Sequence, residues 1–258
     1  MNTHDLKIQQ TEDLIQKVPQ ITVIFWLTKI FATTFGEIAG DAVSMSLNLG
    51  YLISTVIFAI LFITFVVWQI KSSKYRPFIY WFTIIASTTV GTTLADFVDR
   101  SLGIGYWGGS SLLFLCVSLS LWLWYKTEGS ISPHVAHAPR IELFYWITIT
   151  FSQTLGTALG DWSADTAGLG YLGGVALFAC LILFTLYLYL FTPISRVLLF
   201  WTAFVLTRPL GAVVGDFLDK PLSSGGLDLS RFTASIVLFF VMMVCVFWEH
   251  WNYQKRHK

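Results

Sequence analysis

The chain has 258 residues, of which 55% are apolar, 17% aromatic and only 12% charged, and its formal net charge is +1. A soluble domain carries about 25% charged residues, so this composition excludes a disordered chain, a coiled coil and a disulfide scaffold, and the small net charge argues against a nucleic-acid partner. A spanning helix needs about 20 apolar residues, and we therefore expect an all-α integral membrane protein, embedded in a lipid bilayer, with eight spans.

Four similar units make up most of the chain, and a polar segment precedes them. The expected divisions are a cytoplasmic N-terminal segment at 1–20, repeat 1 at 21–72, repeat 2 at 73–127, a cytoplasmic linker at 128–139, repeat 3 at 140–191, repeat 4 at 192–250 and a cytoplasmic tail at 251–258. Each repeat contains two apolar segments, the first between a Trp and an Asp. The sequence therefore predicts eight transmembrane helices built from four two-helix repeats.

The first apolar segment of every repeat is a variant of one motif. The copies read FWLTKIFATTFGEIAGD (25–41), YWFTIIASTTVGTTLAD (80–96), YWITITFSQTLGTALGD (145–161) and FWTAFVLTRPLGAVVGD (200–216). In every copy Gly follows the Trp by ten positions and Asp follows it by fifteen, and a Gly-Tyr pair comes later in three copies. The Trp residues are typical of membrane-interface anchors, and the Gly residues are typical of helix contacts.

Basic residues are distributed unequally between the two ends of these helices. Eleven lie at the termini and between repeats, and only Arg100, Lys220 and Arg231 lie in loops within repeats. Because cytoplasmic loops carry the excess of Lys and Arg, both termini are expected in the cytoplasm. Two spans per repeat then make the four copies parallel, related by an axis along the membrane normal.

Carboxylates recur at the far end of the first helix of every repeat. Each Asp lies about 22 Å along the helix from its Trp, in the outer third of the bilayer, where an uncompensated charge is costly. Residues four and seven positions before the Asp share its helix face and add oxygens in the first three copies. The predicted ion pathway consists of Glu37, Asp41, Asp96, Asp161, Asp216, Thr34, Thr92 and Thr157.

These oxygen ligands favour a hard divalent cation. The predicted metal ligands are the five carboxylates Glu37, Asp41, Asp96, Asp161 and Asp216. Oxygen sites suit Mg²⁺, Mn²⁺ or Ca²⁺ better than Cu or Zn, so Mn²⁺ or Mg²⁺ is the expected substrate or ligand, and no covalently bound cofactor is expected. Protons moving along the same carboxylates are equally natural. The architectural alternative is that G-x-x-x-[G/A]-D is a packing face.

Two basic residues inside the first helices are candidate counter-charges for these carboxylates. Lys29 follows Trp26 by only three positions, so we expect it to snorkel to the cytoplasm. Arg208 is in the middle of its helix, and we expect it to form an ion pair with Glu37 or with one of the Asp residues.

The sequence favours a membrane transporter or channel-like protein that moves a cation, above all a hard divalent metal ion. One alternative is a proton-coupled carrier of a small organic solute, and another is a membrane protein that serves assembly or interaction without transport. The chain has no HExxH motif and no phosphate-cradling loop, so no enzyme is expected. The eight helices either form one bundle or need a homodimer to close a pathway.

The unit of aromatic-Trp, Gly, Gly-Asp and Gly-Tyr, repeated four times, resembles a family of bacterial membrane proteins. That family is defined by four tandem two-helix repeats, each with a characteristic Trp, and its function is unassigned. The resemblance covers residues 18–250 and implies a bacterial inner-membrane setting without supplying chemistry. The chain departs from the pattern at Ala95, at Pro209 and in the missing fourth Gly-Tyr.

Overall fold

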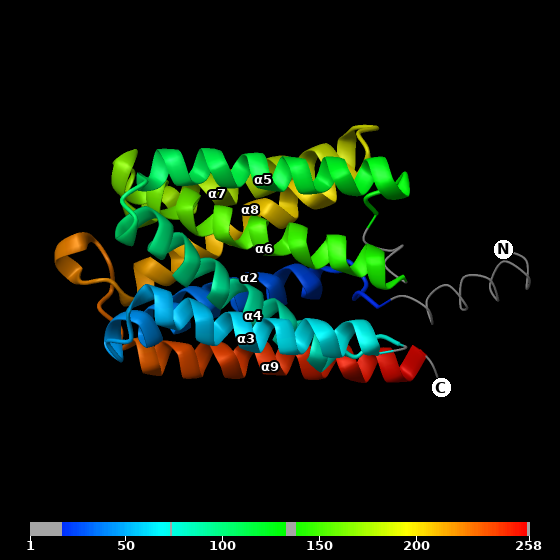
Figure 1. Cartoon of the computed structure of the whole chain (residues 1–258), viewed down its shortest axis with the longest axis horizontal. Coiled ribbons are helices and arrows are strands. Elements are labelled where there is room, and N and C mark those ends of the chain that lie inside the picture. Colours follow the sequence, from blue (N-terminus) through cyan, green and yellow to red (C-terminus); the bar gives the residue numbers. More distant parts are fainter. Residues whose placement is uncertain (1–16, 73, 133–137, 257–258) are drawn as a thin grey trace, which may run out of the picture.

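Eight α-helices dominate the described part of the molecule, residues 17–72, 74–132 and 138–256 of a computed structural model (Figure 1). No strand occurs among these residues, which confirms the all-α prediction. The first helices of the repeats are α2 (Val23–Asp41), α4 (Pro77–Asp96), α6 (Pro139–Asp161) and α8 (Arg196–Asp219). The second helices are α3 (Gly50–Lys71), α5 (Gly105–Glu128), α7 (Gly170–Phe191) and α9 (Arg231–Arg256).

Seven of these eight helices are long and apolar enough to cross a membrane. The exception is α6, which has 23 residues but carries Arg140, Glu142 and Gln153 among its apolar side chains. The predicted set of four two-helix units is therefore present in the described chain, and seven of its helices have the length and composition of membrane spans.

The first helices form an inner ring, and the second helices surround it. Around the ring, α2 packs against α4, α4 against α6, α6 against α8, and α8 against α2. Each outer helix packs mainly against the inner helix of the next repeat: α3 on α4, α5 on α6, α7 on α8, and α9 back on α2. The ring is thereby closed by contacts between the last helix and the first.

All four inner helices run in the same direction (Figure 1). We call the end where they begin, near Val18, the terminal end, and the end where each reaches its motif Asp the Asp end. The outer helices return the chain to the terminal end, on the right of the picture. This arrangement agrees with four parallel repeats around one axis.

The motif Gly residues allow the inner helices to approach closely. A Cβ at Gly156 would overlap the side chain of Arg208 on α8, and a Cβ at Gly211 would overlap Thr33 on α2. Gly36 and Gly91 receive a residue of the following repeat in the same way. The prediction that these residues serve helix contacts is therefore confirmed, and small-xxx-small packing explains the spacing.

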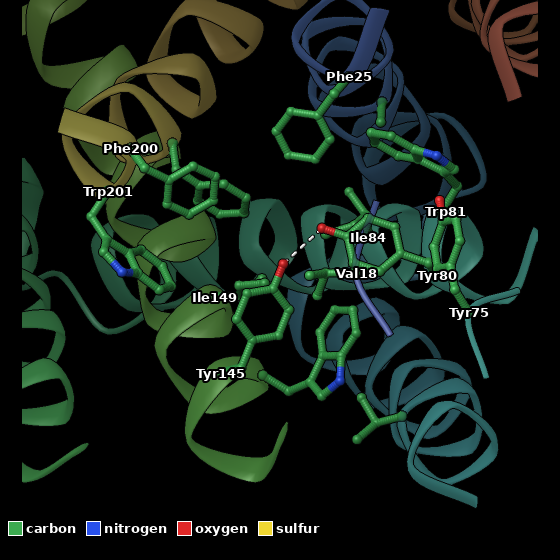
Figure 2. Packing of buried hydrophobic residues seen from close by; sticks show 14 of the residues in the cluster. Val18, Phe25, Tyr75, Tyr80, Trp81, Ile84, Tyr145, Ile149, Phe200 and Trp201 are labelled. Carbon is green, nitrogen blue, oxygen red and sulfur yellow. Dashed lines mark hydrogen bonds between the residues drawn. The ribbon is translucent and has the colours of Figure 1, made fainter. Parts of the chain in front are cut away.

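An aromatic cluster fills the terminal end of the ring (Figure 2). The hydroxyls of Tyr80 and Tyr145 lie 2.7 Å apart. The motif residues Trp81, Trp146 and Trp201 are only 1%, 2% and 3% exposed, so the prediction that they are interface anchors is wrong. The reason is that partners inside the protein satisfy indole N–H groups: Trp201 donates to the Ile131 carbonyl at 2.9 Å.

At the Asp end, the first three repeats turn in the same way. A π-helical turn follows each motif Asp, at η1 (Ala42–Ser46), η2 (Phe97–Ser101) and η4 (Trp162–Thr166). The Gly of each Gly-Tyr pair then begins the outer helix with a left-handed φ, 75° at Gly50 and 65° at Gly170, which other residues adopt only with strain. Repeat 4 instead extends α8 to Asp219 and returns through a longer loop that contains the short helix η5 (Leu222–Ser224).

Candidate functional site

A buried ion pair lies in the middle of the inner ring. Nη2 of Arg208 is 2.9 Å from Oε2 of Glu37, and it also donates to the hydroxyls of Thr92 at 2.7 Å and Thr157 at 2.5 Å. Each of the four inner helices supplies one of these residues. The predicted pairing of Arg208 with Glu37 is therefore present, and the two threonines hold it in place.

The four motif Asp residues come together at the Asp end. Lys220 bridges two of them, with its Nζ 2.5 Å from Asp41 and 3.0 Å from Asp216. Arg100 bridges the other two, at 3.0 Å from Asp96 and 3.3 Å from Asp161. All four carboxylates are buried, so two bridging basic side chains link two pairs of Asp residues.

A third basic residue reaches the same end from the loop of repeat 4. Arg231, at the start of α9, lies 2.5 Å from Asp219 and 3.9 Å from Asp41. The departure of repeat 4 from the motif therefore has a structural role, because its longer loop returns a charge to the cluster.

Two groups of carboxylates have the spacing of metal ligands. Oxygens of Glu37, Asp161 and Asp216 lie within 4.8 Å of one another, and so do oxygens of Asp41, Asp216 and Asp219. Four of the five predicted metal ligands belong to these groups. The fifth, Asp96, is held by Arg100 beside them.

Carboxylates outnumber basic side chains in this part of the described structure. Six of the seven buried carboxylates form ion pairs with four basic side chains, and Asp99 forms none within ion-pair distance in the described residues. The carboxylates are Glu37, Asp41, Asp96, Asp99, Asp161, Asp216 and Asp219, and the basic partners are Arg100, Arg208, Lys220 and Arg231. Isolated buried charge is costly, and in this part of the structure the carboxylates exceed the basic side chains by three.

Lys220 lies in the loop just beyond α8. Burial disfavours its charged form, but the carboxylates of Asp216, Asp41 and Asp219 outweigh burial and hold the pKa of Lys220 well above its usual value. The bridge between the Asp residues is therefore a protonated amine over the whole physiological pH range.

Two predicted site residues lie apart from this network. Thr34 is buried on α2, but it makes none of the bonds that Thr92 and Thr157 make to Arg208. Lys29 has no exposed surface, so the prediction that it snorkels is wrong. Its Nζ lies 3.8 Å from the ring centroid of Phe204 and pairs with no carboxylate of the described residues, because it lies two turns from Glu37 along α2.

The prediction from sequence did not include the bridging residues Arg100, Lys220 and Arg231 in the site. Their positions served there only to infer the orientation of the helices. A local signal existed for two of them. Arg100 follows Asp96 by four positions, and Lys220 follows Asp216 by four, a spacing that brings opposite charges together on a helix. Arg231 had no such signal, since its partner Asp219 is reached only through the loop.

The terminal end is closed by the segment that precedes α2. Lys17 forms an ion pair with Glu142 of α6 and donates to the Ile70 carbonyl at 3.1 Å. Gln69 donates back to the Lys17 carbonyl at 2.9 Å. The next residue, Val18, is buried in the same aromatic cluster as Tyr145 (Figure 2), so this segment closes the ring opposite to the Asp end.

Comparison with known proteins supports the division of the chain into four repeats. A family model described as Repeat of Unknown Function (DUF347) matches the chain four times, at residues 24–75, 79–130, 144–195 and 199–254. Each match begins two positions before a motif Trp, so the matches coincide with the four copies of the motif. No curated protein and no solved structure matches the chain.

Proposed function

We propose that this chain, which belongs to the DUF347 repeat family, is a multi-pass membrane protein that moves a cation, above all a hard divalent ion such as Mn²⁺ or Mg²⁺. The observation that carries the proposal is the group of Glu37, Asp161 and Asp216, whose oxygens three different repeats bring within 4.8 Å. Hard divalent cations take carboxylate oxygens as ligands. The further ligands are the hydroxyls of Thr92 and Thr157, which lie beside Glu37.

The membrane setting of the proposal includes α6 as an eighth span. Its 23 residues extend about 34 Å, which exceeds a hydrocarbon core of about 30 Å. Its polar side chains Glu142 and Gln153 are buried within the ring, so they do not meet lipid. The excess of basic residues at the terminal end supports cytoplasmic termini in a bacterial inner membrane.

Cation entry must compete with the basic side chains that already hold the carboxylates. Arg208 takes one oxygen of Glu37, and Lys220 takes one oxygen of Asp216. An arriving divalent ion replaces these contacts and that of Arg100 with Asp161. Lys220 then keeps Asp41 as a partner, and Arg100 keeps Asp96. The terminal end must then open at the aromatic cluster and the Lys17 segment. The ring closes on itself through α9 and α2, so a second copy is not needed to complete this pathway.

A proton-coupled carrier is the second candidate, and the same surplus of carboxylates favours it. Protons neutralise buried carboxylates without displacing Arg208 or Lys220. In that case the ion-pair network changes with pH and not with metal.

Metal binding by the purified protein separates these proposals. At about 100 times its dissociation constant, Mn²⁺ is expected to raise the free energy of unfolding by about 2.7 kcal/mol. The effect should disappear in Asp161→Asn and persist in Asp165→Asn, because Asp165 is exposed four residues away. Proteoliposomes containing a Mn²⁺-sensitive dye should show uptake with the same dependence on the two variants.

Three results would count against the metal proposal. A shift that is equal in both Asn variants places the metal elsewhere. A response to pH without any response to Mn²⁺, Mg²⁺ or Ca²⁺ supports the proton-coupled carrier. If neither the stability nor the ion flux changes with metal or with pH, the carboxylates serve helix packing, and the non-transporting assembly protein is supported.

A further inference from the structure

An apolar groove lies outside the ring, between α2, α7 and α8 in the half of the molecule near the terminal end. It encloses about 810 Å³, within the range of about 300–1,000 Å³ typical of sites for small ligands. Trp26 and Ile30 form one wall, Ile182 and Tyr189 the other, and Ala203 lies at the floor. Most of its lining side chains are apolar, and the polar ones are Gln20, Thr22, Ser132, Thr185, Arg196 and Thr207. An occupant that is apolar over most of its length therefore fits it.

A comparison with the corresponding seam of repeat 1 shows which side chains leave this space open. At the corresponding place between α3 and α6, Phe62 fills the seam against Trp146, with ring centroids 6.4 Å apart. Phe62 lies twelve positions after the first residue of α3, and the residue twelve positions after the start of α7 is the smaller Ile182. On α8, Ala203 replaces the Thr of the other three copies. Both changes remove volume from this seam.

The groove has a charged rim at one end. Arg196, the first residue of α8, lines it at the terminal end, is exposed, and lies 4.3 Å from the centroid of the Tyr189 ring. From Tyr189 to Ile182 the groove runs about 10 Å, which is comparable with the depth of one leaflet, about 15 Å. A long apolar slot that ends at a guanidinium has the shape and charge of a lipid site.

We propose that this groove binds one acyl chain of an anionic phospholipid, with the lipid phosphate on Arg196. Arg presents several N–H donors that suit phosphate oxygens. The inference needs the helices to lie in a bilayer, as proposed above, but it does not need any transport. It assigns the α2–α7–α8 seam a ligand, and it distinguishes that seam from the one that Phe62 fills.

Lipid binding can be measured on the full-length protein by native mass spectrometry after delipidation. The probes are phosphatidylglycerol and phosphatidylcholine with the same acyl chains. We expect one tightly held phosphatidylglycerol, bound at least about tenfold better than phosphatidylcholine because of the charge-assisted contact. Ile182→Phe copies the filled seam and should weaken binding by at least about tenfold, whereas Leu183→Phe adds the same ring on the exposed face of α7 and should not.

The rim is tested separately from the slot. Arg196→Gln should abolish the preference for phosphatidylglycerol over phosphatidylcholine but leave binding of the acyl chain intact. The control is Arg76→Gln, which changes an exposed residue at the start of another inner helix and should leave both the preference and the acyl-chain binding unchanged. If Ile182→Phe lowers stability, Ala203→Leu fills the floor of the groove instead. Undiminished lipid binding in a folded groove variant, or equal affinity of wild type for the two lipids, overturns the proposal.

Discussion

Arg208 and Glu37 stand at positions where the other copies of the motif carry no charge. The other copies have Thr33, Thr88 and Gln153 at the position of Arg208, and Thr92, Thr157 and Ala212 at the position of Glu37. The ion pair therefore replaces neutral residues that occupy the equivalent positions in the other repeats, where the inner helices pack against each other without a charge pair. A buried pair of this kind adds little net stability, but loss of one partner is costly because the other charge remains.

Arg208→Gln should lower the free energy of unfolding by about 3–5 kcal/mol, since it leaves Glu37 buried without its partner. The double variant Arg208→Gln with Glu37→Gln should recover most of this loss, because Gln153 already occupies the equivalent position. Thermal unfolding in detergent measures both. A double variant that is no more stable than Arg208→Gln contradicts the neutral-pattern interpretation.

Lys220 gives a residue-scale prediction for pH. Its pKa in the folded protein is above the unfolded value of about 10.4, so its stabilising contribution is fully present below about pH 10 and is lost only as pH rises through the higher folded pKa. Lys220→Met should therefore lower the unfolding midpoint equally at about pH 7 and pH 9. Lys126→Met removes an exposed charge and serves as the control. A loss of effect already between these two pH values would show that the folded pKa is not raised.

At the scale of elements, the segment before α2 links parts of the chain that are distant in sequence. Lys17 contacts the last turn of α3 and the first turn of α6, and Val18 enters the aromatic cluster. Both members of the Lys17–Glu142 pair are buried, so the pair is protected from solvent screening. This segment therefore fixes the spacing of the outer and inner helices at the terminal end.

Lys17→Glu should destabilise the protein by about 3 kcal/mol or more, because it places two carboxylates together in a buried site. The exchange variant Lys17→Glu with Glu142→Lys should restore most of the stability. Lys71→Glu reverses an exposed charge at the same end and should change little. Equal destabilisation by the single and the exchanged variants would show that the segment is held by Val18 and not by the ion pair.

The motif spacing predicted the helices because it repeats identically in four copies, and it placed the end of α2 at Asp41 correctly. It also predicted that Arg208 would approach Glu37 or one of the Asp residues, since only a few partners exist for a charge at that depth, and the structure gives Glu37. Burial of Trp81 was not predictable in the same way. A Trp near a helix start has the right depth for the interface, but whether it faces lipid or the ring depends on the neighbouring helices.

At the scale of the whole molecule, the repeats are interlocked and do not stack as separate hairpins. An outer helix packs on the inner helix of the next repeat, and α9 completes the circle on α2. Local sequence could not show this offset, because both helices of a hairpin look the same whichever repeat they contact. Each half of the chain therefore leaves an outer helix without its partner when it is alone.

Separation into two chains, 1–132 and 133–258, tests this interlocking. Two inner-helix contacts, α4 with α6 and α8 with α2, cross the cut, and so do the contacts of α5 with α6 and α9 with α2. Co-expressed halves should copurify through a tag on one of them, and neither half alone should give a monodisperse protein. Gly211→Leu should block copurification because its side chain would overlap Thr33 of the other half, whereas Cys180→Leu, exposed on α7, should not. A tagged half that purifies alone with a cooperative unfolding transition would show instead that two repeats form a self-sufficient unit, and that the contacts of α5 and α9 across the cut are dispensable for folding.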